Sequence, residues 1–118
     1  MSDELKTASK LVASARQDED ALVVRIDGEI DLNNSSELRN ALLGLLGRVN
    51  PKKLVLNLAR VPYMDSSAIA VLVELLRKLR GGKIFLTDLQ PRVKGLLEIA
   101  RLNTIFGIVN SEQDALVK

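Results

Sequence analysis

Two kinds of apolar pattern alternate along this chain. Short runs rich in Leu, Val and Ile occupy residues 21–28, 53–58 and 83–87, and a longer segment follows each of them. In the longer segments apolar residues recur every three or four positions, which is typical of amphipathic helices, whereas the short runs have the length of buried strands. Strands that alternate with helices predict an α/β fold with a largely parallel sheet.

The longer segments predict three helices. The first begins in the polar stretch 33–36, which offers several N-caps, and we expect Gly47 and Pro51 to mark its end. The second ends before the Gly81–Gly82 pair, and the third opens with Pro91, a residue suited to the first helical position. Leucines at helical spacing are expected in the core: Leu38, Leu42 and Leu45 in the first helix, and Leu72, Leu76 and Leu79 in the second.

The two ends of the chain carry weaker signals. Residues 1–9 are polar and irregular, so we expect them to be disordered. Residues 10–16 alternate weakly and meet the next strand at the acidic turn 18–20, which predicts an antiparallel hairpin. Near the other end, residues 105–109 have the composition of an edge strand, and a capping box at Ser111 predicts a short final helix.

Length and composition narrow both the fold and the function. The 118 residues suit a single α/β domain, placed at 10–118, with a mixed, mostly parallel sheet of four to five strands and about four helices packed mainly on one face.

The absence of His and Cys excludes Ser-His-Asp and Cys-His nucleophiles, Cys/His zinc sites and disulfides. A net charge of +2 and 3% aromatic residues argue against a dedicated nucleic-acid binder. The acidic N-terminus does not resemble a secretory signal, and no run approaches about 18 apolar residues, so we expect a cytoplasmic protein without a membrane span.

The most unusual local sequence is Asp65-Ser66-Ser67, which lies between the second apolar run and the second helix. Asp and Ser are favoured helix N-caps because their oxygens accept free N–H groups, so capping is the simpler explanation. A serine at this position is also suited to phosphorylation, since the free N–H groups and the positive end of the helix dipole accommodate a phosphate. The spacing alone leaves both interpretations open, and they are compatible.

Resemblance to a known family favours the phosphorylation interpretation. Residues 65–72, Asp-Ser-Ser-Ala-Ile-Ala-Val-Leu, resemble the Asp-Ser-(Ser/Thr)-Gly-(Leu/Ile)-x-x-Leu signature of the anti-sigma factor antagonists, which are bacterial STAS-domain proteins. Upstream, residues 28–31 resemble the Gly-Glu-apolar-Asp turn of that family, while residues 82–86 and 102–106 resemble its later strand and its Leu-x-x-x-Phe ending. The resemblance covers about residues 10–116 and implies a STAS-like fold for the whole domain.

This resemblance also implies roles for individual residues. Ser66 matches the serine that a partner kinase, the anti-sigma factor, phosphorylates. The unmodified protein would bind that partner and thereby release a sigma factor. A serine phosphatase would remove the phosphate and restore the binding form. ATP would be bound by the partner, so the chain itself is expected to be no enzyme and to need no cofactor or metal. Ala68 stands where Gly is typical, which predicts a stiffer first helical turn and less room for close backbone approach. The expected partner-binding residues are Gly28, Glu29, Ile30, Asp31, Tyr63, Met64, Asp65, Ser66, Ser67 and Ala68.

Other interpretations have weaker support. Related STAS domains serve as accessory subunits of lipid-transport ABC systems or as regulatory modules of larger signalling assemblies, and this is the main alternative. Residues 71–101 carry seven basic and three acidic side chains, a local charge of +4; a solvated helix face explains it most simply, and an acidic partner or an anionic membrane surface is the functional alternative. The Gly81-Gly82-Lys83 sequence lacks the spacing of a phosphate loop, and the carboxylates of Asp27, Glu29 and Asp31 lack the pattern of a calcium loop.

Overall fold

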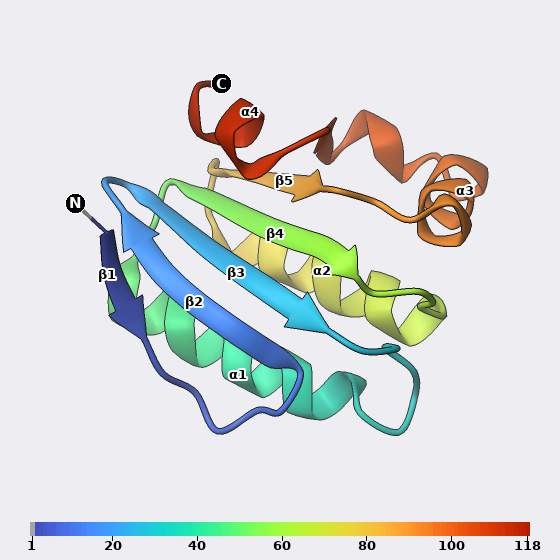
Figure 1. Ribbon diagram of the computed structural model, residues 1–118, viewed down its shortest axis with the longest axis horizontal. Coiled ribbons are helices and arrows are strands. Elements are labelled where there is room, and N and C mark those ends of the chain that lie inside the picture. Colours follow the sequence, from blue (N-terminus) through green and yellow to red (C-terminus); the bar gives the residue numbers. More distant parts are fainter. Residues whose placement is uncertain (1) are drawn as a thin grey trace.

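The computed structural model, which describes residues 2–118, contains one mixed sheet of six strands with helices on both faces (Figure 1). Its elements are β1 (Ser2–Leu5), β2 (Val12–Asp18), β3 (Ala21–Asp27), α1 (Ser35–Val49), β4 (Lys53–Arg60), α2 (Ser66–Lys78), β5 (Lys83–Thr87), α3 (Pro91–Ile99), the 3-10 helix η1 (Leu102–Thr104), β6 (Gly107–Val109) and α4 (Glu112–Leu116). The strands lie in the sheet in their order along the chain. The first three pair antiparallel, and β3 to β6 pair parallel, which confirms the predicted hairpin and the largely parallel sheet.

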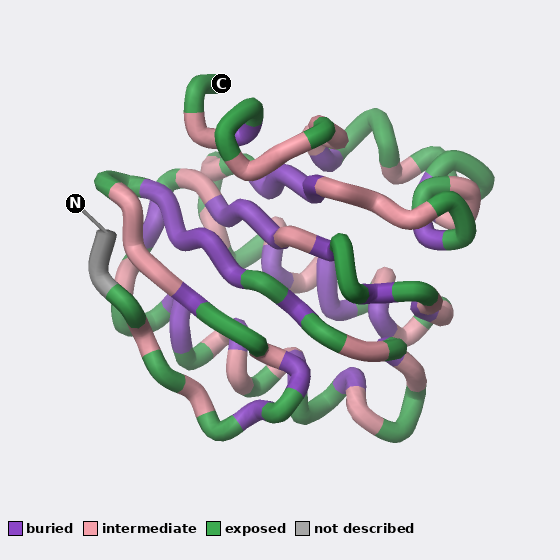
Figure 2. The backbone as a smooth tube through the Cα atoms, viewed as in Figure 1, coloured by how far each residue is buried: buried purple, intermediate pink, exposed green. Residues whose placement is uncertain are grey.

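Three helices connect the parallel strands, each one stepping to the next neighbour in the same direction across the sheet. Such crossovers are right-handed in nearly all proteins, and right-handed steps in one direction place their helices on one face. Figure 1 shows α1 and α2 side by side behind the sheet, where an ion pair of 2.7 Å between Arg39 and Glu74 joins them. Val93 and Leu97 of α3 belong to the same apolar core. The central strands, covered on both faces, are buried along most of their length (Figure 2).

The N-terminal segment differs from the prediction. Residues 2–5 are not disordered but form β1, an edge strand that pairs with β2 and raises the number of strands above the expected four to five. Polar residues give a weak strand signal, yet an edge strand has one side open to solvent and tolerates them. Leu5 packs against the main core and anchors the strand. The first residue of the segment lies outside the described residues.

The third helix begins where the sequence predicts, since Pro91 is the first residue of α3. Of the two predicted markers for the end of α1, Pro51 is confirmed because it directly follows the C-cap Asn50, whereas Gly47 lies inside the helix, which continues to Val49. The helix ends at Asn50, whose backbone is left-handed with φ 50° and ψ 55° and whose N–H donates to the carbonyl oxygen of Leu46. Asn tolerates this conformation better than most side chains, so it replaces the glycine expected at a helix end.

The final helix, α4, covers part of the sheet face that the other helices leave open. Its predicted cap is confirmed, because the Ser111 hydroxyl oxygen accepts a hydrogen bond of 3.1 Å from the Asp114 N–H. A second, smaller apolar cluster lies beneath α4 and contains Val23, Val55, Phe85 and Ala115.

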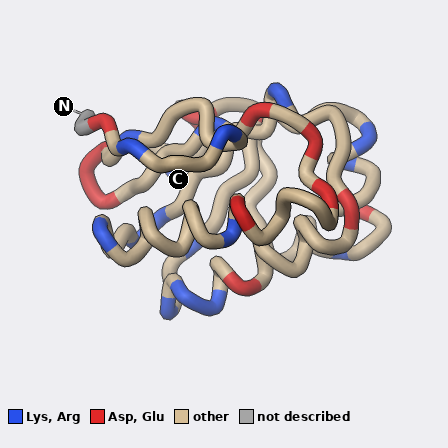
Figure 3. Tube along the Cα trace, turned by 90° about the horizontal axis from the view of Figure 1, so that it is seen from below, with Lys and Arg blue, Asp and Glu red and all other residues tan. Residues whose placement is uncertain are grey.

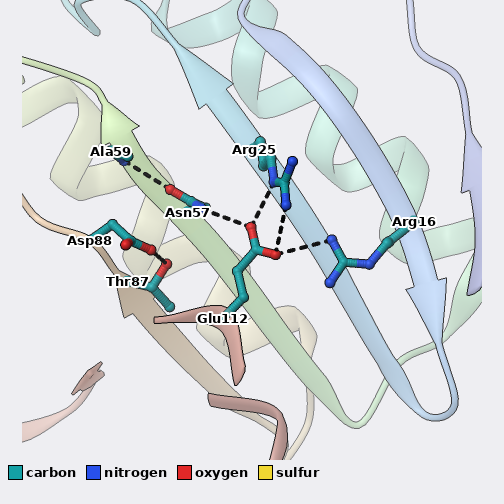
Figure 4. Close-up of polar contacts among 7 residues, drawn as sticks. All are labelled: Arg16, Arg25, Asn57, Ala59, Thr87, Asp88 and Glu112. Atoms are coloured by element: carbon teal, nitrogen blue, oxygen red, sulfur yellow. Dashed lines mark hydrogen bonds and ion pairs between the residues drawn. The ribbon is translucent and has the colours of Figure 1, made fainter. Parts of the chain in front are cut away.

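A carboxylate at the start of α4 fastens this helix to three strands (Figure 4). Glu112 accepts hydrogen bonds from Arg25 at 2.8 and 3.1 Å, from Arg16 at 3.1 Å and from the Asn57 amide at 2.7 Å. The hydrogen bonds from Arg25 have the largest effect on the carboxyl group and, with the other donors, lower the pKa of Glu112 from 4.5 to about 2. Charge as well as apolar packing therefore holds α4 on the sheet.

Two further features of the described residues bear on function. Among residues 2–118, no helix is both long enough and apolar enough to cross a bilayer. The same residues contain no group of three metal-binding side chains arranged to hold an ion, so Asp27, Glu29 and Asp31 do not form one.

Candidate functional site

The two predicted motifs lie side by side at the carboxyl ends of the neighbouring parallel strands β3 and β4 (Figure 1). The Gly28 N–H donates to the Arg60 carbonyl oxygen at 3.0 Å. Farther along, the Ile30 N–H donates to the Tyr63 carbonyl oxygen at 3.1 Å, and the Asp65 N–H donates to the Ile30 carbonyl oxygen at 3.2 Å. These bonds extend the pairing of the two strands into the loops. The loop residues 28–32 and 63–67 therefore form one surface, here named the Ser66 surface.

Local hydrogen bonds shape the first of these loops. Gly28 begins it with a φ of 115°, a conformation that favours glycine. The Asp31 N–H donates to Asn34 Oδ1 at 2.9 Å, and Asp31 Oδ1 accepts from the Asn33 N–H at 2.9 Å. The Asn34 amide also donates to the Glu29 carbonyl oxygen at 2.8 Å. The polar stretch predicted to cap α1 thus closes the turn before it, and the Asn34 side chain makes no capping bond to the helix.

Asp65 links the second loop to α2 and to the first loop. It is the N-cap of α2, and its Oδ1 accepts hydrogen bonds from the Ser67 N–H at 2.9 Å and the Ser67 hydroxyl at 2.5 Å. Its Oδ2 accepts from the Leu32 N–H at 3.2 Å. The Ser67 hydroxyl, followed by these backbone donors, holds the pKa of the Asp65 carboxyl below its usual value. The capping interpretation is therefore confirmed for Asp65.

The two serines differ in the state of their hydroxyl groups. Ser66 is the first residue of α2 and is exposed, and its hydroxyl makes no hydrogen bond within the part of the chain that the structure describes. Ser67 is half-buried, and its hydroxyl is bound to the Asp65 carboxylate. Of the two, only Ser66 presents an exposed hydroxyl without a hydrogen-bond partner among the described residues.

Three of the predicted partner-binding residues point into the core. Ile30, Met64 and Ala68 are 2%, 3% and 2% exposed and belong to the main apolar cluster. Their side chains hold the loops in place, so they offer a partner no contact surface. The methyl group that Ala68 adds relative to glycine also faces inward, which leaves the outer surface of the first helical turn unobstructed. Glu29 and Ser66 are exposed, and the remaining predicted residues, Gly28, Asp31, Tyr63, Asp65 and Ser67, are half-buried.

Two residues that the sequence analysis did not single out also lie here. Leu32 is 79% exposed although its N–H is bound to Asp65. The Arg92 guanidinium of α3 lies over the Tyr63 ring, 5.1 Å from its centroid. Leu32 had a sequence signal, because it is an apolar residue in a polar stretch outside any helical stripe. Arg92 had none, because nothing local relates α3 to the loop after β4.

Acidic residues lie at this end of the molecule together with several basic ones (Figure 3). The Ser66 surface itself carries the carboxylates of Glu29, Asp31 and Asp65. Leu32 is an exposed apolar side chain that these charged groups border. The arrangement holds a free hydroxyl, Ser66, within that surface.

Comparison with known proteins identifies the family to which this chain belongs. The STAS domain family model matches residues 12–115. The anti-sigma F factor antagonist of Paenibacillus polymyxa is 30% identical over 99 residues, which are 82% of this chain and 85% of that protein. The anti-sigma-B factor antagonist of Bacillus subtilis is 33% identical over 95 residues, which are 79% of this chain and 85% of that protein. The crystal structure of an anti-sigma factor antagonist from Mycobacterium paratuberculosis matches with a TM-score of 0.80 at 20% identity, covering 99% of this chain and 92% of that one. The motifs and the fold of this chain, together with these matches, show that it belongs to the STAS-domain family.

Proposed function

We propose that this protein is an anti-sigma factor antagonist and that phosphorylation of Ser66 switches it off. The observation that supports the proposal is the division of roles at the start of α2, where Asp65 caps the helix, Ser67 donates to Asp65 and the Ser66 hydroxyl stays exposed. The relatives named anti-sigma factor antagonists support an anti-sigma factor as the partner. The resemblance of residues 65–72 to the family signature implies that this partner is also a serine kinase. That kinase binds the ATP, so this chain supplies the acceptor hydroxyl and no catalytic group.

In its unmodified form the protein binds the anti-sigma factor through the Ser66 surface and thereby releases a sigma factor. Leu32 provides an exposed apolar contact, and Glu29, Asp31 and Asp65 border it with negative charge. Buried apolar side chains in the middle of a contact contribute most of the binding energy, while charges at its rim select the partner. The complementary partner surface carries an apolar depression with basic residues around it.

A phosphate on Ser66 changes the charge of this surface and preserves the fold. It adds a charge of about −1.5 to −2 next to the carboxylate of Asp65. In the free protein the N-terminus of α2 stabilises that charge. At a closed interface the same charge is desolvated and repelled by its acidic neighbours, and a penalty of about 3 kcal/mol lowers the affinity by about two decades. A serine phosphatase then restores the binding form.

The first test is incubation with ATP and the candidate kinases, beginning with any small ATP-binding kinase encoded beside this gene. Intact-mass measurement and peptide mapping should find one added phosphate, on Ser66. Ser66→Ala should abolish the modification, and Ser67→Ala is the matched control that should retain it. Phosphate found on Ser67 in the unaltered protein would contradict the assignment.

The second test is affinity for the kinase that modifies the protein. Ser66→Asp should weaken binding by about a hundredfold, matching a penalty of about 3 kcal/mol, and leave the thermal midpoint nearly unchanged. Equal binding of the phosphorylated and unmodified proteins would overturn the switch. Unfolding of Ser66→Asp would show that this serine acts chiefly in the structure of the helix start.

A further inference from the structure

A cavity of about 620 Å³ opens at the end of the sheet opposite to Ser66. The carboxyl-terminal ends of α1 and α2 form one side of it, and the segments that lead into β4 and β5 form the other. Its volume lies within the range of small-ligand sites. The residues that line it are Leu46, Asn50, Pro51, Lys52, Lys78, Leu79, Arg80, Gly81, Gly82, Lys83 and Lys118.

The charge of this cavity is one-sided. Its cationic side chains are Lys52, Lys78, Arg80, Lys83 and Lys118, and no lining residue has a carboxylate side chain. None of these cations lies within 4 Å of a carboxylate in residues 2–118, whereas Arg16, Arg25, Arg39 and Arg60 each do. Lys78 also acts on the Glu74 carboxylate one turn away on its own helix. The remaining like charges repel one another, and a bound anion relieves that repulsion.

Part of the clustering has a structural cause. Lys78 lies in the last turn of α2, where a positive charge complements the helix dipole. That explanation does not extend to Lys52 and Lys83, which precede or begin strands. The Lys83 N–H donates to the Lys52 carbonyl oxygen at 3.1 Å, and a Cβ on Gly82 would lie only 2.6 Å from that oxygen. A glycine is therefore needed to bring the turn after α2 against Lys52 and to place the two lysines on one rim.

The floor of the cavity is less polar than its rim. Leu46 is 7% exposed, Pro51 is buried and Leu79 is half-buried. We propose that this cavity binds a phosphate-bearing anion, with the phosphate groups on the lysine and arginine rim and the less polar part of the ligand on the floor. The basic side chains of residues 71–101 therefore lie in two different places on the molecule. Arg80 and Lys83 line the cavity, whereas Arg92 lies beside Tyr63.

This site is separate from the switch and does not depend on it. The 13 residues of α2 place its two ends about 20 Å apart, more than twice the Debye length at physiological salt. Phosphorylation at the first end should therefore leave anion binding at the second unchanged. The ligand chemistry is a phosphate ester or polyphosphate, and it has two sources, a free small molecule or a lipid headgroup.

The test for a free ligand is a titration with tripolyphosphate at constant ionic strength, followed by the backbone amide spectrum. The amides of Lys52, Gly81, Gly82 and Lys83 should shift together along one binding curve. Lys52→Gln/Lys83→Gln should weaken binding about tenfold, which corresponds to about 1.4 kcal/mol. The matched control, Lys10→Gln/Lys94→Gln, removes two exposed charges elsewhere and should bind as the unaltered protein does.

The test for a lipid headgroup is co-sedimentation with phosphatidylglycerol vesicles, with phosphatidylcholine vesicles as the neutral control. Sedimentation that Lys52→Gln/Lys83→Gln abolishes assigns the site to a lipid, and tripolyphosphate binding without sedimentation assigns it to a free ligand. The absence of saturable binding in both experiments overturns the proposal, and so does an equal loss in the two double variants. Ser66→Asp should bind tripolyphosphate normally, so a failure of the phosphorylation switch leaves this result interpretable.

Discussion

The Ser66 surface and the α4 face each depend on one carboxylate with a lowered pKa, and the two carboxylates are stabilised in different ways. Asp65 receives its hydrogen bonds mainly from its own helix, two residues away, and lies next to an exposed surface. Glu112 receives its hydrogen bonds from three strands and joins distant parts of the chain. The comparison separates a carboxylate that shapes the proposed binding surface from one that holds the fold together.

The largest effect on stability should follow from removing the charge of Glu112. Glu112→Gln leaves Arg16 and Arg25 without their counter-charge and should lower the free energy of unfolding by about 2–3 kcal/mol, measured by urea denaturation. Glu98→Gln is the matched control, because Glu98 is exposed and forms no ion pair among the residues described. Equal stability of the two variants would show that α4 is held by apolar packing alone.

A related effect should appear in the dependence of stability on pH. The pKa of Glu112 is about 2 in the folded protein and 4.5 as its ordinary value, so the carboxylate stabilises the fold fully above pH 4.5. That contribution is lost as the pH falls from 4.5 toward 2, because protonation then favours the unfolded chain. Because solvent partly screens this charge, the free energy of unfolding should fall by about 2 kcal/mol over this pH range. The fall should be absent in Glu112→Gln. Parallel pH profiles for the two proteins would contradict the pairing.

The same contrast explains what the sequence predicts well and what it does not. The cap at Asp65 was predictable because Ser67, which it binds, lies in the same motif, and Pro91 and Ser111 mark helix starts by equally local rules. The partners of Glu112 lie 55, 87 and 96 residues away from it, so no local pattern selects them. The strand β1 was missed for the same reason, because only its pairing with β2 makes a strand of a polar segment.

An intermediate effect is expected at Asp65. Asp65→Ala removes the cap of α2 and the acceptor for the Leu32 N–H, and should lower the thermal midpoint by about 3–6 °C. Asp65→Asn is the control that retains a capping oxygen and should recover most of this loss. A calorimetric scan of both variants separates capping from charge, and equal midpoints for Ala and Asn would mean that the cap contributes nothing.

The smallest effect on stability, and the sharpest test of the Ser66 surface, is expected at Leu32. Its side chain is 79% exposed, so Leu32→Ala should change the free energy of unfolding by less than about 0.5 kcal/mol. As a central apolar contact it should nevertheless weaken binding to the anti-sigma factor about tenfold, measured by titration calorimetry. Ile99→Ala is the matched control, because Ile99 is 85% exposed at the far end of α3 and should affect neither quantity. A loss of affinity at both positions would mean that the partner covers more than the Ser66 surface, and a loss at neither would remove Leu32 from the contact.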